Sequence, residues 1–356
     1  MSDMRDEMLR TLDRIVEDTV VTTVREKADG LGSGGAFSAG GQAQAEATAP
    51  LWAALEEAGI TGIGAGGDDD VAFSDCMELI RRAGHHALPV PLAETIMARR
   101  MLSRVGMEAP DGAITLAPPG ASEPIVSQGH GFAAGATAKS VPYASTSAHC
   151  LVASNTGLHL LDISAAVSMQ GTNMAGEPRD MIDLGKARVV AHCPLEHAAP
   201  ALEAEGALAR ATQLAGAMGA ATEHALIWVN DRIQFGRPIA KHQAVQHLMA
   251  QLAEEMAAAG AAADLAIAAS QTGPDRLSIA IAKARTGEAA GKGANIVHAL
   301  FGAMGFTREH ALHYTTRRLW AWRNEFGSEV YWQGEIGRAV AAKGGRSLWT
   351  SLTREM

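Results

Sequence analysis

The 356-residue sequence has few cysteines and no long apolar run, and each shortage excludes a class of protein. Its three cysteines, Cys76, Cys150 and Cys193, lie far apart without CxxC spacing, so we predict neither a disulfide framework nor a metal site. No run of ~18 apolar residues occurs, and the charged N-terminal segment lacks the apolar stretch of a signal peptide. We therefore expect a protein of the reducing cytoplasm that does not cross a membrane.

Positive charge is also scarce. The chain has 30 Lys and Arg against 39 Asp and Glu, a formal net charge of -9. This balance argues against a nucleic-acid partner, because a phosphate backbone needs a basic patch. Arg317 and Arg318 form the densest basic run, and we expect them on a solvated or interface face. Hydrophobic residues make up 47% and charged residues 19%, which indicates a large buried surface.

The sequence pattern changes twice along the chain and predicts an α+β multi-domain protein. Residues 1–109 show helical periodicity, apart from a Gly-, Ala- and Ser-rich stretch at 28–47 that we predict to be a mobile loop. Residues 110–195 contain short segments rich in Val, Ile and Thr, which predict an antiparallel β domain. Residues 196–356 contain four long helical patterns and predict a four-helix bundle. The helical patterns lie at 4–28, 49–59, 73–86, 91–106, 196–234, 236–270, 273–302 and 307–324.

The break between the first two bundle helices reads DRIQFGRPIAKHQAVQHLM. Gly236 allows a turn, Pro238 can start the next helix, and Arg232 and Arg237 flank the exposed Phe235. A helix start presents free N–H groups, so arginine, aromatic ring and helix start together suit the pyrophosphate and adenine of a nucleotide. A plain helix–helix corner with the phenylalanine packed into the core is the open alternative.

These residues resemble a known family. RIQFGRPIAKHQ is similar to the R-x-Q-F-G-x-P-I-x-x-x-Q signature of the FAD-dependent acyl-CoA dehydrogenases, and FGAMGFTREHALHYTTRRLW resembles the family's Gly-Gly-x-Gly-Phe/Tyr segment. The α–β–α order also agrees. The resemblance implies oxidation of an acyl-CoA substrate, in which a carboxylate removes the α-proton and hydride passes to FAD. It further implies a dimer or tetramer, with an electron-transfer flavoprotein as the electron acceptor.

The resemblance also assigns cofactor-binding residues. The signature residues would reach the adenosine diphosphate part of an FAD that lies mainly in the neighbouring subunit. Gly302 and Gly305 would let the backbone approach the pyrophosphate, and Ser328 matches the Thr of a family Gly-Thr step. The signature set is Arg232, Gln234, Phe235, Ile239, His242 and Gln243.

The catalytic base is where the family pattern fails. The family carries it as the Glu of a Tyr-Glu-Gly-Thr step, and alignment without gaps from Gly305 places Phe326 there, one residue after Glu325. A slip of one residue at this loop would restore Glu325 as the base. Other members carry the base on the first bundle helix, where this chain has Gly206, next to Glu205. Both base positions therefore lack an acid.

Other cofactor contacts are lost as well. The family's pyrophosphate-contacting Gln is Ala299 here, the second Gly of the pair is Ala303, and ITLAPPGASEP only faintly resembles the family's flavin loop. Our leading interpretation is the base-lacking, non-catalytic subunit of a heteromeric acyl-CoA dehydrogenase, whose partner subunit supplies the base and most of the flavin site. Related two-subunit enzymes act on bulky thioesters such as steroid side chains. The alternatives are a self-sufficient homomer that uses Glu325 and a helical scaffold without flavin.

Overall fold

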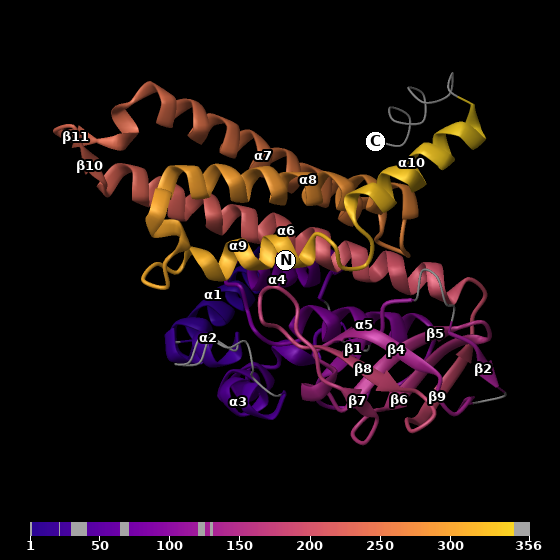
Figure 1. Cartoon of the computed structure of the whole chain (residues 1–356). Coiled ribbons are helices and arrows are strands. Elements are labelled where there is room, and N and C mark those ends of the chain that lie inside the picture. The colour runs from indigo at the N-terminus through magenta and orange to yellow at the C-terminus, as the bar shows by residue number, and fades with distance from the viewer. Residues whose placement is uncertain are drawn as a thin grey trace.

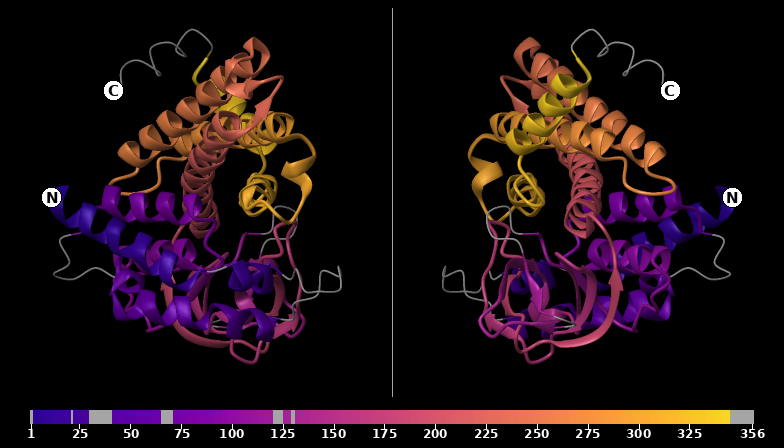
Figure 2. Two further views of the ribbon diagram at one scale, coloured as in Figure 1. Left: turned by 90° about the vertical axis from the view of Figure 1, so that its left-hand side faces the viewer. Right: turned by 90° about the vertical axis from the view of Figure 1, so that its right-hand side faces the viewer.

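A computed structural model describes residues 2–20, 22–29, 41–64, 71–119, 125–128 and 131–344. Helices form the N-terminal part, two packed sheets form the middle, and long helices form the C-terminal part (Figure 1). Figure 2 shows the long helices as one layer above the N-terminal helices and the sheets. The expected α, β, α order is thus confirmed, while the exact domain boundaries stay a prediction. Within the described residues, no helix is both long and apolar enough to span a bilayer.

The N-terminal helices differ from the prediction at two places. The pattern at 4–28 forms two helices, because β-branched residues dominate positions 19–24 and favour helix interruption. Helix α3 begins at Gly41, so the loop predicted through residue 47 is wrong from 41 onward, where Ala and Gln favour a helix. The rest of that loop lies outside the described residues. The elements are α1 Ser2–Thr19, α2 Thr22–Ala28, α3 Gly41–Glu57, η1 Ile60–Gly62, α4 Phe73–His85 and α5 Leu92–Arg104.

Two sheets pack face to face in the middle part. One has the strand order β1-β5-β6-β9 and the other β4-β8-β7. Among the described strands, only the pairing of β1 with β5 is parallel, a departure from the all-antiparallel expectation. Cys150, Val152, Val141 and Ile182 form one buried cluster between the sheets. The strands are β1 Ile114–Leu116, β2 Ser127–Gln128, β3 Gly131–Phe132, β4 Thr137–Pro142, β5 His149–Ser154, β6 Gly157–Asp162, β7 Val167–Met169, β8 Arg179–Asp183 and β9 Arg188–Pro194, with a 3-10 turn η2 at Ala144–Thr146.

The predicted bundle helices form, but the second begins later than expected. Pro238 lies in a short hairpin, and a 3-10 turn separates it from Gln243, the first residue of α7. Buried alanines line the contacts between the helices, which allows their axes to approach closely. A further helix, α10, follows the four predicted ones. The elements are α6 Ala198–Asp231, β10 Ile233–Gln234, β11 Arg237–Pro238, η3 Ile239–Lys241, α7 Gln243–Ala269, α8 Arg276–Phe301, η4 Gly302–Phe306, α9 Leu312–Trp322 and α10 Glu329–Lys343.

Candidate functional site

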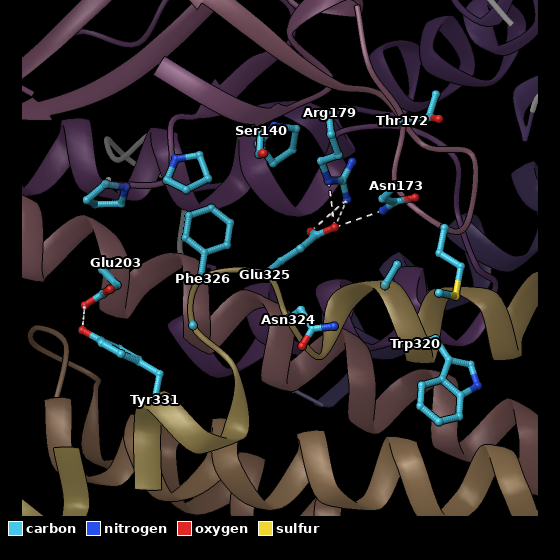
Figure 3. A pocket seen from close by; sticks show the side chains of 16 residues that line it. Ser140, Thr172, Asn173, Arg179, Glu203, Trp320, Asn324, Glu325, Phe326 and Tyr331 are labelled. Atoms are coloured by element: carbon cyan, nitrogen blue, oxygen red, sulfur yellow. Dashed lines mark hydrogen bonds and ion pairs between the residues drawn. The ribbon is translucent and has the colours of Figure 1, made fainter. Parts of the chain in front are cut away.

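A cavity of about 590 Å³ lies where the loop between α9 and α10 faces the sheets (Figure 3). Much of its wall is apolar, and polar side chains reach it from β4, β8, α6 and the α9–α10 loop. The apolar lining consists of Pro118, Pro119, Pro142, Met174, Trp320, Ala321 and Phe326. The polar lining is Ser140, Thr172, Asn173, Arg179, Glu203, Asn324, Glu325 and Tyr331.

The α9–α10 loop has a fixed backbone. Phe326 and Gly327 both adopt left-handed conformations, with φ of 51° and 92°, which is unusual for a phenylalanine. The Nζ of the fully buried Lys283 donates to the carbonyls of Arg323 and Gly327 at 2.8 Å each. Trp332 Nε1 donates to the Phe326 carbonyl at 2.9 Å. These buried donors hold the backbone in the strained conformation and so fix where the loop side chains lie.

Glu325, the predicted alternative base, is held by three side chains, which we call the Glu325 cluster: Asn173, Arg179 and Arg210. Arg179 donates from Nε to Oε1 and from Nη2 to Oε2, both at 2.8 Å. Arg210 Nε donates to Oε2 at 2.8 Å, and Asn173 Nδ2 donates to Oε1 at 3.0 Å. Burial raises the pKa of the Glu325 carboxyl, but the two guanidiniums outweigh it and hold that pKa below its usual value. The carboxylate is therefore saturated with donors and poorly suited to accept a proton.

The ion pairs continue beyond the cluster and connect distant parts of the chain. Arg210 also pairs with Glu94 of α5, and Arg179 also pairs with Glu177 at 3.0 Å. Arg318 of α9 joins Glu177 at 3.0 Å and Asp29, after α2, at 2.8 Å. Because Arg318 is 1% exposed within this chain, the expectation that it lies on a solvated or interface face is wrong. Its two acid partners compensate the burial of the charge.

Phe326 and Gly206, the two positions where the resemblance places a base, lie in direct contact. Phe326 is buried, and a Cβ added to Gly206 would lie only 2.2 Å from Cδ1 of its ring. The ring therefore occupies the space that a side chain at position 206 would need. Glu205 turns away, forms a buried ion pair with Arg104 of α5, and has its pKa raised by burial.

A second carboxylate on the cavity was not predicted. Glu203 lies one turn before Gly206 on α6, and Figure 3 shows it with Tyr331 at the other side of Phe326 from Glu325. Tyr331 Oη donates to Glu203 Oε2 at 2.9 Å, and so does Arg276 Nη2, also at 2.9 Å. The sequence signal that could have indicated Glu203 is its i, i+3 spacing from Gly206, which places both residues on the same face of α6.

The predicted cofactor hairpin lies at the far end of the bundle (Figure 1). The side chain of Phe235 is 92% exposed at its tip, so the alternative of a phenylalanine packed into the core is wrong. Arg232, Gln234 and Gln243 are also exposed, and His242 is half-buried at the N-cap of α7. Such a ring and guanidinium beside a helix start fit an adenosine diphosphate group that is covered from outside this chain. The remaining signature residue, Ile239, is buried in the bundle core and supports the hairpin from within.

The other predicted cofactor residues divide between two places. Gly302 is exposed in turn η4 with φ of 59°, next to the contact in which Phe301 stacks on Trp228 of α6 at 4.7 Å. Gly305 is buried, and a Cβ there would lie 2.9 Å from Nδ1 of His298, so packing within the chain already requires a glycine. Ser328 lies apart from both, where its hydroxyl caps α10 beside the cavity.

Comparison with known proteins finds a family match for the C-terminal part. Residues 202–340 match the family described as acyl-CoA dehydrogenase, C-terminal domain. Glutaryl-CoA dehydrogenase of Desulfococcus multivorans is 38% identical over 106 residues, a match that spans 28% of this chain and only 27% of that protein.

Solved structures extend the likeness to the whole fold. The steroid ACAD Tcur3481-Tcur3483 has a TM-score of 0.78 at 21% identity, covering 96% of this chain and 99% of its own. The ChsE4-ChsE5 complex from Mycobacterium tuberculosis gives 0.76 at 20% identity, with 95% and 97% coverage. Butyryl-CoA dehydrogenase from Megasphaera elsdenii gives 0.74 at 15% identity, with 96% and 99% coverage. At these identities the likeness establishes a shared fold.

Proposed function

We propose that this chain, whose residues 202–340 match the acyl-CoA dehydrogenase C-terminal domain and whose fold is similar to that of those enzymes, is the base-lacking subunit of a heteromeric acyl-CoA dehydrogenase. Such an enzyme performs the α,β-dehydrogenation of an acyl-CoA thioester with FAD. The partner subunit supplies the carboxylate that removes the α-proton.

One observation carries the proposal: the contact between Phe326 and Gly206. The resemblance places the base of some members at one of these positions and that of other members at the second. Here both positions lack an acid, and the phenyl ring fills the space between them. A side chain introduced at position 206 would collide with the ring, so the two replacements are structurally matched.

The nearest carboxylate does not compensate for this loss. A general base must reach the substrate proton and needs a pKa near the working pH. Glu325 is fully engaged by the Glu325 cluster, and the guanidiniums of Arg179 and Arg210 hold its pKa down. The alternative of a self-sufficient homomer, which needs this carboxylate as its base, is therefore disfavoured.

The hairpin supports a continuing role with FAD. FAD accepts hydride in this family, and we propose that Arg232, Gln234, Phe235, His242 and Gln243 bind the adenosine diphosphate half of an FAD held mainly by the neighbouring subunit. The exposure of Arg232, Gln234 and Gln243 supports this assignment, and so does that of Phe235, which is 92% exposed. A scaffold without flavin need not keep the full signature, which this chain retains at Arg232 and Phe235.

Three further expected residues have weaker support. Gly302 is exposed and left-handed, which suits a close backbone approach by the pyrophosphate. Gly305 and Ser328 already have structural roles, in packing against His298 and in capping α10. We keep all three as cofactor-binding proposals, with Gly302 as the strongest.

The partners follow from the same proposal. Two of the similar structures are named as pairs of proteins, the ChsE4-ChsE5 complex and the Tcur3481-Tcur3483 steroid ACAD, and this supports a partner subunit for this chain. Acyl-CoA is the proposed substrate of the assembly, and the likeness to the Tcur3481-Tcur3483 steroid ACAD favours a bulky acyl group such as a steroid side chain. An electron-transfer flavoprotein is the proposed acceptor of the electrons.

Turnover by the chain alone tests the proposal. The purified chain is given FAD, a panel of acyl-CoA thioesters and an artificial electron acceptor. We expect no dehydrogenation above background from either the wild type or the Glu325→Gln variant. Turnover by the wild-type chain would instead establish the homomeric enzyme, and its loss in a Glu325→Gln protein shown to be folded would identify Glu325 as the base.

A further inference from the structure

The cavity has two polar ends with different capacities to bind a ligand (Figure 3). At one end, each oxygen of Glu325 accepts two hydrogen bonds, from Asn173 and Arg179 at Oε1 and from Arg179 and Arg210 at Oε2. That carboxylate has no remaining acceptor capacity for a ligand. Of the two carboxylates that line the cavity, only Glu203, at the opposite end, is therefore left to accept a hydrogen bond from a ligand.

The opposite end contains an acceptor that is only half used. Tyr331 Oη and Arg276 Nη2 both donate to Oε2 of Glu203, and no hydrogen bond from the described part of the chain reaches Oε1. The side chain of Glu203 is 15% exposed and lines the cavity, so Oε1 can accept a hydrogen bond from solvent or from a ligand. A ligand that shields Glu203 from solvent must donate a hydrogen bond of its own, because a buried acceptor without a donor is strongly unfavourable.

The surrounding charges select a neutral donor. Arg276 pairs with Glu203 at 2.9 Å and with Glu335 at 3.0 Å, and Glu335 also pairs with Arg338. Two carboxylates thus meet two guanidiniums, and the group has no excess negative charge to attract an ammonium ion. A hydroxyl satisfies Glu203 without bringing an uncompensated charge into the cavity.

From these contacts we propose that the Glu203 end of the cavity binds the hydroxyl group of an otherwise apolar ligand. The apolar body would lie along Phe326, Trp320 and Met174, and the hydroxyl would donate to Glu203 Oε1. The inference rests on the proposed function in that it takes this cavity as the place of the acyl group. It adds a specificity: an acyl group with a hydroxyl remote from the thioester is preferred over the same skeleton without a donor.

A pair of probes that contain neither CoA nor flavin tests the specificity directly. Decahydro-2-naphthol and 2-decalone share a bicyclic skeleton that fits a cavity of 590 Å³, but only the alcohol can donate. Calorimetric titration of the full chain should give at least tenfold tighter binding of the alcohol, since a site that holds a buried polar group discriminates against a ligand that lacks the matching one. Equal binding, tighter binding of the ketone, or no saturable binding of either would overturn the inference.

Three variants locate the acceptor. Glu203→Gln removes the charge and should reduce the preference for the alcohol to below about threefold, because hydrogen bonds to charged groups are the stronger ones. Glu254→Gln, at an exposed position on α7, should leave it unchanged. Tyr331→Phe keeps the carboxylate and its arginine, so the preference should persist even if Glu203→Gln fails to fold. Loss of the preference in Tyr331→Phe would make the phenol the partner and refute the role of Glu203.

This experiment fails independently of the proposed function. The probes require neither FAD nor a partner subunit, so a chain that proves to be a complete homomeric enzyme would still prefer the alcohol. Conversely, a chain without the preference could still be the base-lacking subunit, with a different acyl specificity.

Discussion

Replacing Glu325 by glutamine should mainly reduce stability, which a catalytic role for this residue would not predict. Three N–H bonds from Arg179 and Arg210 end on its carboxylate, each at 2.8 Å. In Glu325→Gln one carboxylate oxygen becomes an NH2 group, which cannot accept, so the N–H groups that point at it lose their acceptor, while those at the other position meet a neutral oxygen. Each of the three bonds therefore loses at least roughly 1 kcal/mol, the difference between bonds to charged and to neutral partners. The sum of about 3 kcal/mol lies at the lower end of the ~3–5 kcal/mol seen when one partner of a buried ion pair is removed.

The acidic partners that Arg179 and Arg210 keep in Glu325→Gln limit the loss of stability. Arg179 keeps Glu177 and Arg210 keeps Glu94, so neither guanidinium becomes an isolated buried charge. We therefore expect a loss of about 3 kcal/mol rather than complete unfolding. Urea titration of the full chain, followed by circular dichroism, gives the shift in the midpoint.

Glu254→Gln is the matched control, because this residue is exposed on α7, where a substitution changes stability by at most ~0.5 kcal/mol. A Glu325→Gln protein as stable as the control would refute the structural role.

The stability supplied by Glu325 also has a defined pH dependence. Its folded-state pKa is lowered, so the contribution is present above the ordinary glutamate pKa of ~4.3 and disappears as the pH falls below it. The destabilisation caused by Glu325→Gln should shrink in acid.

Three more substitutions test other parts of the structure. Gly206→Ala places a Cβ against the Phe326 ring and should destabilise the chain by ~1–3 kcal/mol. In a Phe326→Ala background, which removes the ring, the same substitution should cost much less. An equal cost of Gly206→Ala in both backgrounds would contradict the contact. Burial lowers the pKa of Lys283 to about 7 in the folded chain, whereas the unfolded chain keeps the ordinary lysine pKa. Above pH 7 the unfolded state therefore binds more protons than the folded state, and the free energy of unfolding of the wild type should rise by up to ~1.4 kcal/mol per pH unit. Urea titrations from pH 6 to 9 should show that this rise in stability with pH is absent in Lys283→Met. The rise should persist in the control Lys292→Met, because Lys292 lies on the exposed part of the same helix. Equal slopes of stability against pH in the wild type and both variants would refute the lowered pKa of Lys283. Phe235→Ala should leave the urea midpoint unchanged but lower the flavin retained by the assembled heteromer, and full retention would remove this residue from the cofactor site.

Local sequence signals predicted the elements whose determinants lie close together in the chain. HCLVASNTGLHLLDI forms the β5–β6 hairpin as expected, because its two apolar runs and the turn residues between them lie within one segment. RIQFG forms an exposed turn because Gly236, with φ of 80°, follows the exposed phenylalanine directly. The late start of α7 was missed because Pro238 is compatible with a strand as well as with a helix start.

The site residues that escaped prediction depend on contacts across the chain. Arg318 pairs with Asp29, 289 residues away, and no local pattern distinguishes a surface arginine from one with such a partner. Glu203 reaches the cavity only because α6 packs beneath the α9–α10 loop, where Tyr331 meets it. Lys283 is buried on α8 for the same reason, since its partners are carbonyls of that loop, which carry no sequence signal.

The amount of flavin bound per chain tests the proposed dependence on a partner most directly. The chain is purified alone, incubated with excess FAD, separated from free cofactor and measured by the absorbance of the bound flavin. We expect well below one flavin per chain, because the hairpin with Phe235 presents its side chains to the outside and leaves the rest of the cofactor to a neighbour. A stoichiometry near one would show that this chain holds FAD without a different partner subunit and would contradict the proposal.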